Sequence, residues 1–189
     1  KPGGKKGGQV RFRLSLGSAE RVFDCNETWQ KYEVTGIRMA GHPAENARVL
    51  LIGGGCGVAP LLFLGKHLKS KGFKPDVLLG FRNSARIIEY DDYAGIGPLY
   101  LTTEDGSEGE KGFVTDHPLL KETHFDHICC CGPDPMMKSV ARYCLDKGIN
   151  CEVSLEHLMA CGFGVCLCCV VDTRSGNLCT CIDGPVFNT

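Results

Sequence analysis

The chain has 189 residues, of which 43% are hydrophobic and 23% are charged, and its formal net charge is −1. This composition is that of an ordinary globular protein with enough apolar residues to bury a core. A balance so close to neutral argues against a nucleic-acid partner or an anionic membrane surface, and no apolar run reaches the roughly 18 residues that a membrane span needs.

Residues 1–47 differ in pattern from the rest of the chain. They open with a polar, glycine-rich stretch, Lys1–Gly8, which cannot pack a core. Val10–Leu16 alternates in hydrophobicity as a strand does, and no further pattern is recognisable through Ala47. We therefore interpret 1–47 as a remnant or linker before the first regular domain.

Strands and helices alternate from Arg48 to Leu155. The predicted strands are Arg48–Ile52, Asp76–Phe81, Pro98–Thr103, Phe125–Cys131 and Ile149–Leu155. The predicted helices are Val58–Lys71, Gly112–Lys121 and Asp134–Lys147. This alternation predicts an α/β fold, with a doubly wound parallel sheet over 48–155 and a small terminal module over 156–189.

The connection after the first strand is rich in glycine and consists of Gly53, Gly54, Gly55, Cys56 and Gly57. Glycines there let the backbone approach a pyrophosphate, and the N-terminus of the next helix supplies unpaired N–H groups. The dinucleotide fingerprint is incomplete, because Val58 takes the position of its third glycine and Asp76 begins a strand where an acidic residue should end one. A connection that is merely tight is the alternative to nucleotide binding.

Two further loops are expected at the same edge of the sheet. Cys131, Gly132 and Pro133 follow the fourth strand, and Glu104 and Asp105 follow the third. Ligands of open α/β sheets bind outside the carboxyl ends of the strands, so this convergence favours a nucleotide site. The alternatives to a nucleotide site are purely structural: Pro133 could simply start a helix, and the two carboxylates could cap a turn.

The segment 156–189 carries the strongest motif. Cys161, Cys166 and Cys169 read C-x4-C-x2-C, and Cys181 follows after eleven residues, which is the plant-type ligand spacing of a [2Fe–2S] cluster. Gly162 and Gly164 lie in the first loop, where a positive φ and close backbone approach are expected.

Several alternatives to this ligand set stay open. Cys168 and Cys179 could compete as ligands, a zinc ribbon would show two C-x2-C knuckles, and disulfides would suit a small secreted chain. A Rieske site through His157 lacks a second histidine nearby.

The remaining cysteines and histidines carry less information. Thirteen cysteines in all argue for a reducing compartment, which we take to be the cytoplasm. His117, His124 and His127 show no metal pattern and are expected at the surface or at the edge of the core.

Five motifs in this order carry a family resemblance: LLIGGGCGVAPLL, TTEDGSEGEKGFVT, CGPDPMM, EVSLEHLMACGFGVC and CIDGPVF. From about Arg48 to Thr189 the chain resembles the electron-transfer subunit of class 1B dihydroorotate dehydrogenase, in the ferredoxin–NADP reductase superfamily. The CGFGVC and CIDGPVF motifs narrow the resemblance most, because the nucleotide loop and the cluster spacing are shared more widely.

The resemblance implies three cofactors, a [2Fe–2S] cluster, NAD(H) and FAD. It also implies a partner, the FMN-containing dihydroorotate dehydrogenase catalytic subunit, in a heterotetramer that serves pyrimidine biosynthesis. Electrons would pass from FMN through the cluster and FAD to NAD+. Carried onto this sequence, Gly53, Gly54, Gly55 and Gly57 would line the pyrophosphate, Cys131, Gly132 and Pro133 would face the nicotinamide, and Glu104 and Asp105 would lie near the ribose.

The sequence departs from the family at its start. The family places a flavin-binding β-barrel before the nucleotide domain, whereas residues 1–47 are too short for one and lack its Arg-Pro-x-Ser-like motif. A truncated barrel is therefore expected. Alternative functions are the small subunit of an NADP-linked ferredoxin or sulfide oxidoreductase complex and a flavin-free iron–sulfur redox adaptor. No acid–base catalyst is expected in this chain.

Overall fold

The structure is a computed structural model that describes residues 11–16, 19–24, 43–44, 46–174 and 176–189. The chain divides into two compact units, one of Lys1–Gly36 with Glu156–Pro185 and the other of Ile37–Leu155 with Val186–Thr189. The polar stretch Lys1–Gly8 lies outside the described residues, as does most of the expected remnant 1–47. The predicted boundaries at 47 and 155 stay predictions.

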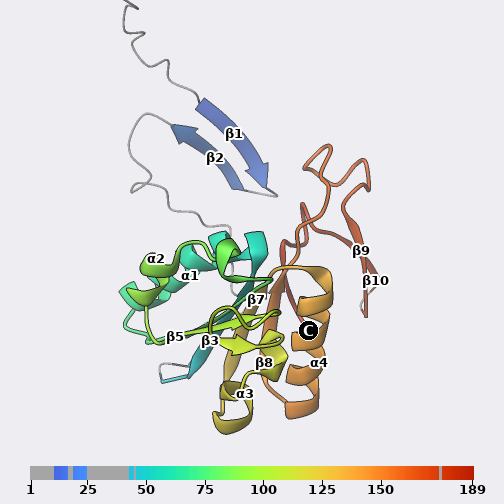
Figure 1. The fold of residues 1–189 in the computed structure, drawn as a ribbon. Helices are drawn as coiled ribbons and strands as arrows, with labels where there is room; N and C mark the ends of the chain where they lie inside the picture. The colour runs from blue at the N-terminus through green and yellow to red at the C-terminus, as the bar shows by residue number, and fades with distance from the viewer. Residues whose placement is uncertain (1–10, 17–18, 25–42, 45, 175) are drawn as a thin grey trace, which may run out of the picture. The chain divides into compact units, whose positions relative to one another are not determined.

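The unit of 37–155 and 186–189 is built on a seven-stranded sheet in the order β11-β8-β7-β3-β4-β5-β6 (Figure 1). Its strands are β3 Val49–Gly54, β4 Asp76–Phe81, β5 Leu99–Thr103, β6 Glu110–Lys111, β7 His127–Cys131, β8 Asn150–Ser154 and β11 Val186–Asn188. All neighbours are parallel except β11, which pairs antiparallel with β8.

The order of the strands makes this a doubly wound sheet. The chain builds outward from β3 through β4 and β5, then returns to the other side of β3 to add β7 and β8. The predicted fold class is therefore confirmed, and the topological switch point lies between β3 and β7.

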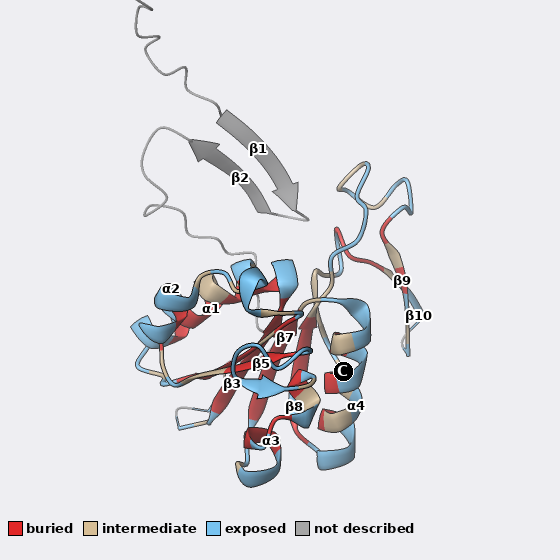
Figure 2. Ribbon diagram, viewed as in Figure 1, coloured by how far each residue is buried: buried red, intermediate tan, exposed pale blue. Residues whose placement is uncertain are grey.

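Helices cover both faces of the sheet. The long helices are α1 Val58–Ser70 and α4 Asp134–Lys147, and the short ones are α2 Tyr90–Ala94 and α3 Leu119–Glu122. Leu61 and Leu64 of α1 belong to the same buried cluster as Leu51 of β3, while Val140 of α4 belongs to the other cluster, with Leu50. Because β3 and β7 are buried on both faces (Figure 2), their sequences read as continuous apolar runs.

One predicted helix is wrong. Gly112–Lys121 is not a single helix but a 3-10 turn at Val114–Asp116 followed by α3. Pro118 disfavours helical geometry in the residue before it, and His117 accordingly has φ −60° and ψ 133°. Sequence periodicity also missed α2, β6 and β11, which have five residues or fewer.

The other unit contains two hairpins in its described parts. β1 Arg11–Leu16 pairs antiparallel with β2 Ala19–Asp24, in agreement with the predicted strand there. β9 Val170–Thr173 pairs antiparallel with β10 Gly176–Cys179 and follows the cysteine loop. Across the described ranges, no helix combines the length and the apolar character needed to cross a membrane.

Leu50 offers a direct test of the two-faced core. It is fully buried on the central strand β3, so Leu50→Ala should lower the free energy of unfolding by about 2–5 kcal/mol. Leu145→Ala is the matched control, since Leu145 is 43% exposed on α4 and should stay within about 0.5 kcal/mol of the parent. Urea unfolding followed by circular dichroism measures both, and equal losses would contradict this assignment of the core.

Candidate functional site

The glycine connection forms a tight turn between β3 and α1. β3 ends at Gly54, a 3-10 turn spans Gly55–Gly57, and α1 starts at Val58. Gly55 has φ +54°, a left-handed conformation that glycine adopts without strain, and a Cβ added there would meet open space. The turn therefore exposes its backbone on one side, as a loop that cradles a phosphate must.

The other side of this turn lies against the carboxyl end of β7. A Cβ on Gly57 would lie 2.5 Å from the backbone C and O of Cys131 and from the backbone N of Gly132, and a Cβ on Gly132 would lie 3.0 Å from the N and O of Gly54. Met136 of α4 covers Gly54 with its Sδ, 2.5 Å from a built Cβ. Sequence analysis did not single out Met136, because nothing in a single sequence pairs it with Gly54.

These contacts bring two predicted groups of residues together at the switch point of the sheet. Within the glycine turn, Gly54 and Gly57 contact Cys131, Gly132 and Pro133. Helices α1 and α4 both begin at this edge of the sheet (Figure 1). Two helix N-termini at one edge supply unpaired backbone N–H groups and the positive ends of two helix dipoles. Such an edge suits the phosphates of a dinucleotide.

Glu104 and Asp105 lie at the same edge of the sheet but after β5, with β4 between them and the glycine turn. Asp105 caps its own turn, because its carboxylate accepts hydrogen bonds from the Ser107 hydroxyl at 2.6 Å and the Ser107 N–H at 2.9 Å. These two bonds lower the pKa of Asp105 below its usual range. The backbone N–H of Glu104 donates to the carbonyl of Phe81 at the end of β4. Because the Glu104 side chain is exposed, we regard its carboxylate as the one that could contact a ligand.

Asp76 has a structural role at the opposite edge of the sheet. It is buried at the start of β4, and the Arg48 Nε donates to its carboxylate at 3.1 Å. This pairing accounts for an acidic residue that begins a strand. Because Asp76 lies at the start of β4 and the glycine turn follows the end of β3, Asp76 is not at the edge that carries the turn.

The cysteine loop belongs to the unit that contains 156–185. Gly162 and Gly164 have φ of +73° and +84°, so the expected positive φ is found at both. A Cβ on Gly164 would lie 2.8 Å from Ile182. Leu167, between two cysteines, also has a positive φ of 57°, which is strained for a residue with a Cβ and is found most often at functional sites.

The thiols of this loop form two interacting pairs. The Cys161 side chain contacts that of Cys166, and backbone N–H groups of Cys166, Phe163 and Val165 point at its sulfur, which lowers the pKa of Cys161 to about 6. The Cys169 side chain contacts that of Cys181, whose backbone N–H lowers the pKa of Cys169.

This donor set suits a two-iron cluster. Two irons with two thiolates each need two such pairs, and backbone N–H groups directed at the sulfurs stabilise the negative charge that the thiolates carry. Cys181 also receives the N–H of Gly164, so the glycine loop contributes to the second pair as well as to the first.

The two alternative cysteines are placed differently. Cys168 is exposed, and only its backbone N–H reaches toward a sulfur, that of Cys166 at 3.5 Å. Cys179 is buried against Cys169 and Cys181 at the end of β10, and burial raises the pKa of its thiol. Its side chain also contacts that of Cys169, so Cys179 packs beside the second pair; the pKa of Cys181 is raised too, by its own side-chain contact with Cys169.

Comparison with known proteins identifies both parts of the chain. The family model for the iron–sulfur cluster binding domain of dihydroorotate dehydrogenase B matches residues 156–189, and the model for an oxidoreductase NAD-binding domain matches residues 51–142. The dihydroorotate dehydrogenase B (NAD(+)) electron transfer subunit of Clostridium acetobutylicum is 39% identical over 183 residues, which cover 95% of this chain and 72% of that protein. The chain belongs to the family of dihydroorotate dehydrogenase B electron transfer subunits.

Other relatives agree with this assignment. The electron transfer subunit of Clostridium perfringens is 44% identical over 147 residues, which cover 76% of this chain and 58% of that protein. The chain thus spans less than two thirds of that relative. A solved structure of an NADH-dependent reduced ferredoxin–NADP oxidoreductase superposes with a TM-score of 0.69 at 35% identity, over 78% of this chain and 55% of that one.

The predicted resemblance, fold class and oxidoreductase class are therefore confirmed. Membership of the dihydroorotate dehydrogenase B electron transfer subunits implies a [2Fe–2S] cluster, NAD(H) and FAD. The individual site residues stay predictions, and the contacts at the switch point and in the cysteine loop show which of them lie together.

Gly57→Ala tests the contact at the switch point. Its added methyl would enter the backbone of Cys131 and Gly132, so it should lower the free energy of unfolding by about 1–3 kcal/mol and weaken NADH binding at least tenfold. Gly95→Ala is the control, because Gly95 has φ −74° and its built Cβ is 3.4 Å from the nearest atom. Unfolding and NADH titration would be compared, and tight NADH binding by Gly57→Ala would contradict the proposed loop.

Proposed function

We propose that this chain passes electrons between the FMN of a dihydroorotate dehydrogenase catalytic subunit and NAD+, through a [2Fe–2S] cluster and FAD, in pyrimidine biosynthesis. The observation that carries the proposal is the presence in one chain of a nucleotide-type edge at a sheet switch point and two thiol pairs in plant-type order. An adaptor without nucleotide binding would need only the second of these.

The nucleotide residues have separate roles in this proposal. The backbone of Gly53, Gly54, Gly55 and Gly57 binds the pyrophosphate, assisted by the N-terminus of α1. Cys131, Gly132 and Pro133 face the nicotinamide. Glu104 is our candidate for the ribose, and Asp105 supports it by fixing the turn through Ser107.

The two thiol pairs support the proposed cluster ligands. Cys161 and Cys166 would hold one iron, and Cys169 and Cys181 the other. When bound, the cluster supplies one-electron transfer, while nicotinamide accepts two electrons as hydride. The chain's own part is to keep the four sulfurs paired and surrounded by backbone N–H donors.

FAD is needed between these two carriers, because a flavin exchanges electrons singly or in pairs. The family assignment supports FAD binding by the protein. No described residue is assigned to the flavin.

An apolar surface near the cluster loop supports a protein partner. Within 156–185 the exposed apolar side chains flank the cysteines and are Leu158, Met159, Phe163, Val165, Leu167 and Ile182, with exposed fractions from 47% to 85%. A concentration of apolar groups on an exposed loop is typical of an interface. We propose that the FMN-containing catalytic subunit covers this loop, in a heterotetramer that brings its electron donor close to the cluster.

The thiols also support a location. The twelve cysteines within the described residues form no disulfide with one another, and reduced thiols persist in reducing compartments. We propose that the protein works in the cytoplasm.

A second candidate follows from the solved ferredoxin–NADP oxidoreductase. Its likeness favours an NADP-linked small subunit as the alternative assignment of the same architecture. The 2′-phosphate of NADP would bind to two exposed side chains that follow β4, Arg82 and Arg86. The substrate specificity of the complex decides between the two.

The decisive experiment is reconstitution. The protein with its catalytic subunit, under anaerobic conditions, should produce NADH from NAD+ when dihydroorotate is added, and should produce far less NADPH from NADP+. NADP+ reduction driven by reduced ferredoxin, without any response to dihydroorotate, would establish the second candidate instead.

Serine substitutions separate cluster ligands from bystanders. Cys161→Ser, Cys166→Ser, Cys169→Ser and Cys181→Ser should each lose most of the about two irons and about two sulfides per chain. Cys168→Ser and Cys179→Ser should keep them, since neither residue belongs to the two proposed ligand pairs, which follow the plant-type spacing. Iron, sulfide and the visible spectrum are measured after anaerobic purification, and loss of iron in Cys168→Ser would reject this ligand set.

A pair of leucines tests the partner surface. Leu158→Lys places a charge on a side chain that is 85% exposed in the cluster unit and should weaken binding of the catalytic subunit by about 2 kcal/mol, roughly 30-fold. Leu145→Lys, on α4 with 43% exposure, should leave it unchanged. Calorimetric titration of both cluster-loaded variants measures this, and identical affinities would move the interface elsewhere.

A further inference from the structure

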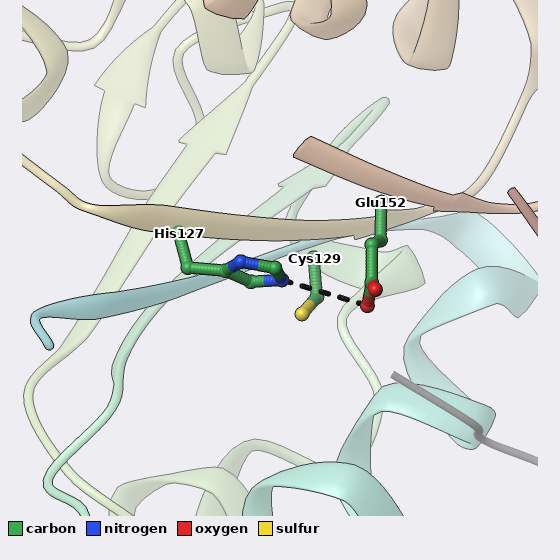
Figure 3. A group of neighbouring side chains, drawn as sticks. All are labelled: His127, Cys129 and Glu152. Carbon is green, nitrogen blue, oxygen red and sulfur yellow. Dashed lines mark ion pairs between the residues drawn. The ribbon is translucent and has the colours of Figure 1, made fainter. Parts of the chain in front are cut away.

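Three buried polar side chains gather on two neighbouring strands of the NAD-binding unit. His127 and Cys129 lie two residues apart on β7 and therefore share a face of the sheet. Glu152 of β8 is the register partner of Cys129 in the parallel pair. Figure 3 shows the three side chains directed toward one another from these strands.

The surroundings of this group are apolar. His127 is 8% exposed, Cys129 4% and Glu152 3%. Cys129 belongs to the core cluster formed with Val49 and Leu51 of β3, on the face that α1 covers. Polar groups buried in such a place need strong partners, because their transfer from water is costly.

The distances between the three side chains are close to those of residues that bind one metal ion. His127 Nε2 and Glu152 Oε2 are 3.5 Å apart, which is ion-pair distance (Figure 3) but longer than the about 2.7–3.2 Å of an N–H···O hydrogen bond. His127 Nε2 is buried and has no hydrogen-bond partner in the part of the chain that the structure describes. The Nε2, Sγ and carboxylate oxygen atoms all lie within 4.8 Å of one another.

We propose that His127, Cys129 and Glu152 form a binding site for a divalent transition metal, with zinc as the expected ion. At zinc bond lengths of about 2.0–2.3 Å, ligand atoms at the corners of a tetrahedron are about 3.3–3.6 Å apart. The observed 3.5 Å between His127 Nε2 and Glu152 Oε2 is one such edge. Cys129 Sγ lies within 4.8 Å of both atoms, and binding of the ion would draw it to the third corner.

The ligand set selects the class of ion. A thiolate and an imidazole favour borderline transition metals, whereas Mg²⁺ and Ca²⁺ prefer oxygen ligands alone. Three protein ligands leave a fourth position on zinc for water.

A metal at this site would stabilise the sheet and would take no part in the iron–sulfur cluster proposed for residues 156–185. It joins β7 to β8, and β7 ends at Cys131, directly before Gly132. Zinc would therefore fix the pair of strands on one side of the switch point. The inference does not depend on the proposed electron transfer, since none of the three residues is a proposed cluster or nucleotide ligand.

The test is the metal content of the cluster-loaded protein. Cluster cysteines bind zinc when they lack iron, so the chain is purified anaerobically with its cluster assembled, exposed to zinc, and dialysed against a mild chelator. The parent should retain about one zinc per chain beside its iron. Glu152→Gln and His127→Gln should keep the iron and bind zinc more than roughly 100-fold more weakly, because even residues outside the coordination sphere change affinity about 10- to 100-fold.

His124→Gln is the matched control, since His124 lies on the connection just before β7 with its side chain 78% exposed. It should retain zinc like the parent. Circular dichroism checks that each variant is folded, and Cys129→Ser provides a third variant if one of the others is not. A parent chain that holds no zinc overturns the proposal whatever the variants do, as does zinc retained equally by Glu152→Gln and His127→Gln.

Discussion

The contact between the glycine turn and the end of β7 constrains the whole NAD-binding unit. Gly57 lies so close to Cys131 and Gly132 that a built Cβ would be 2.5 Å from their backbone atoms. Only two glycine-containing segments can approach in this way, and their approach brings the N-termini of α1 and α4 to one point of the sheet. The edge of the sheet that suits an anion therefore depends on this packing contact.

A different constraint governs the cysteine unit. Four thiolates around one cluster concentrate negative charge. Backbone N–H groups of the loop stabilise this charge by pointing at the sulfurs, and the positive φ at Gly162 and Gly164 helps to orient them. The chain leaves the sheet after Leu155 and returns at Val186, whose register partner in the sheet is Ser154. Both ends of this segment are thus anchored at neighbouring positions, which limits the entropy lost when the segment orders.

Buried polar groups distinguish the two halves of the sheet. Asp76 on β4 accepts a hydrogen bond from Arg48, whereas the buried Nε2 of His127 on β7 has no hydrogen-bond partner among the described residues and lies at ion-pair distance, 3.5 Å, from Glu152 Oε2. A sheet interior tolerates such groups only when something compensates for their lost hydration. The proposed metal ion would give His127 Nε2 a partner, whereas Asp76 already has one in Arg48.

The sequence by itself determined the α/β fold class, the glycine-rich turn after the first strand of the domain and the thiol spacing, because each rests on local periodicity or on residues close in the chain. It failed at Gly112–Lys121, where Pro118 breaks the helix, and at β11, whose three residues gain their partner only from β8. Only the tertiary structure decided that Asp76 pairs with Arg48, and that Glu152 lies beside Cys129. These are relations across 28 and 23 positions of chain, fixed by strand order and register, which no local pattern encodes.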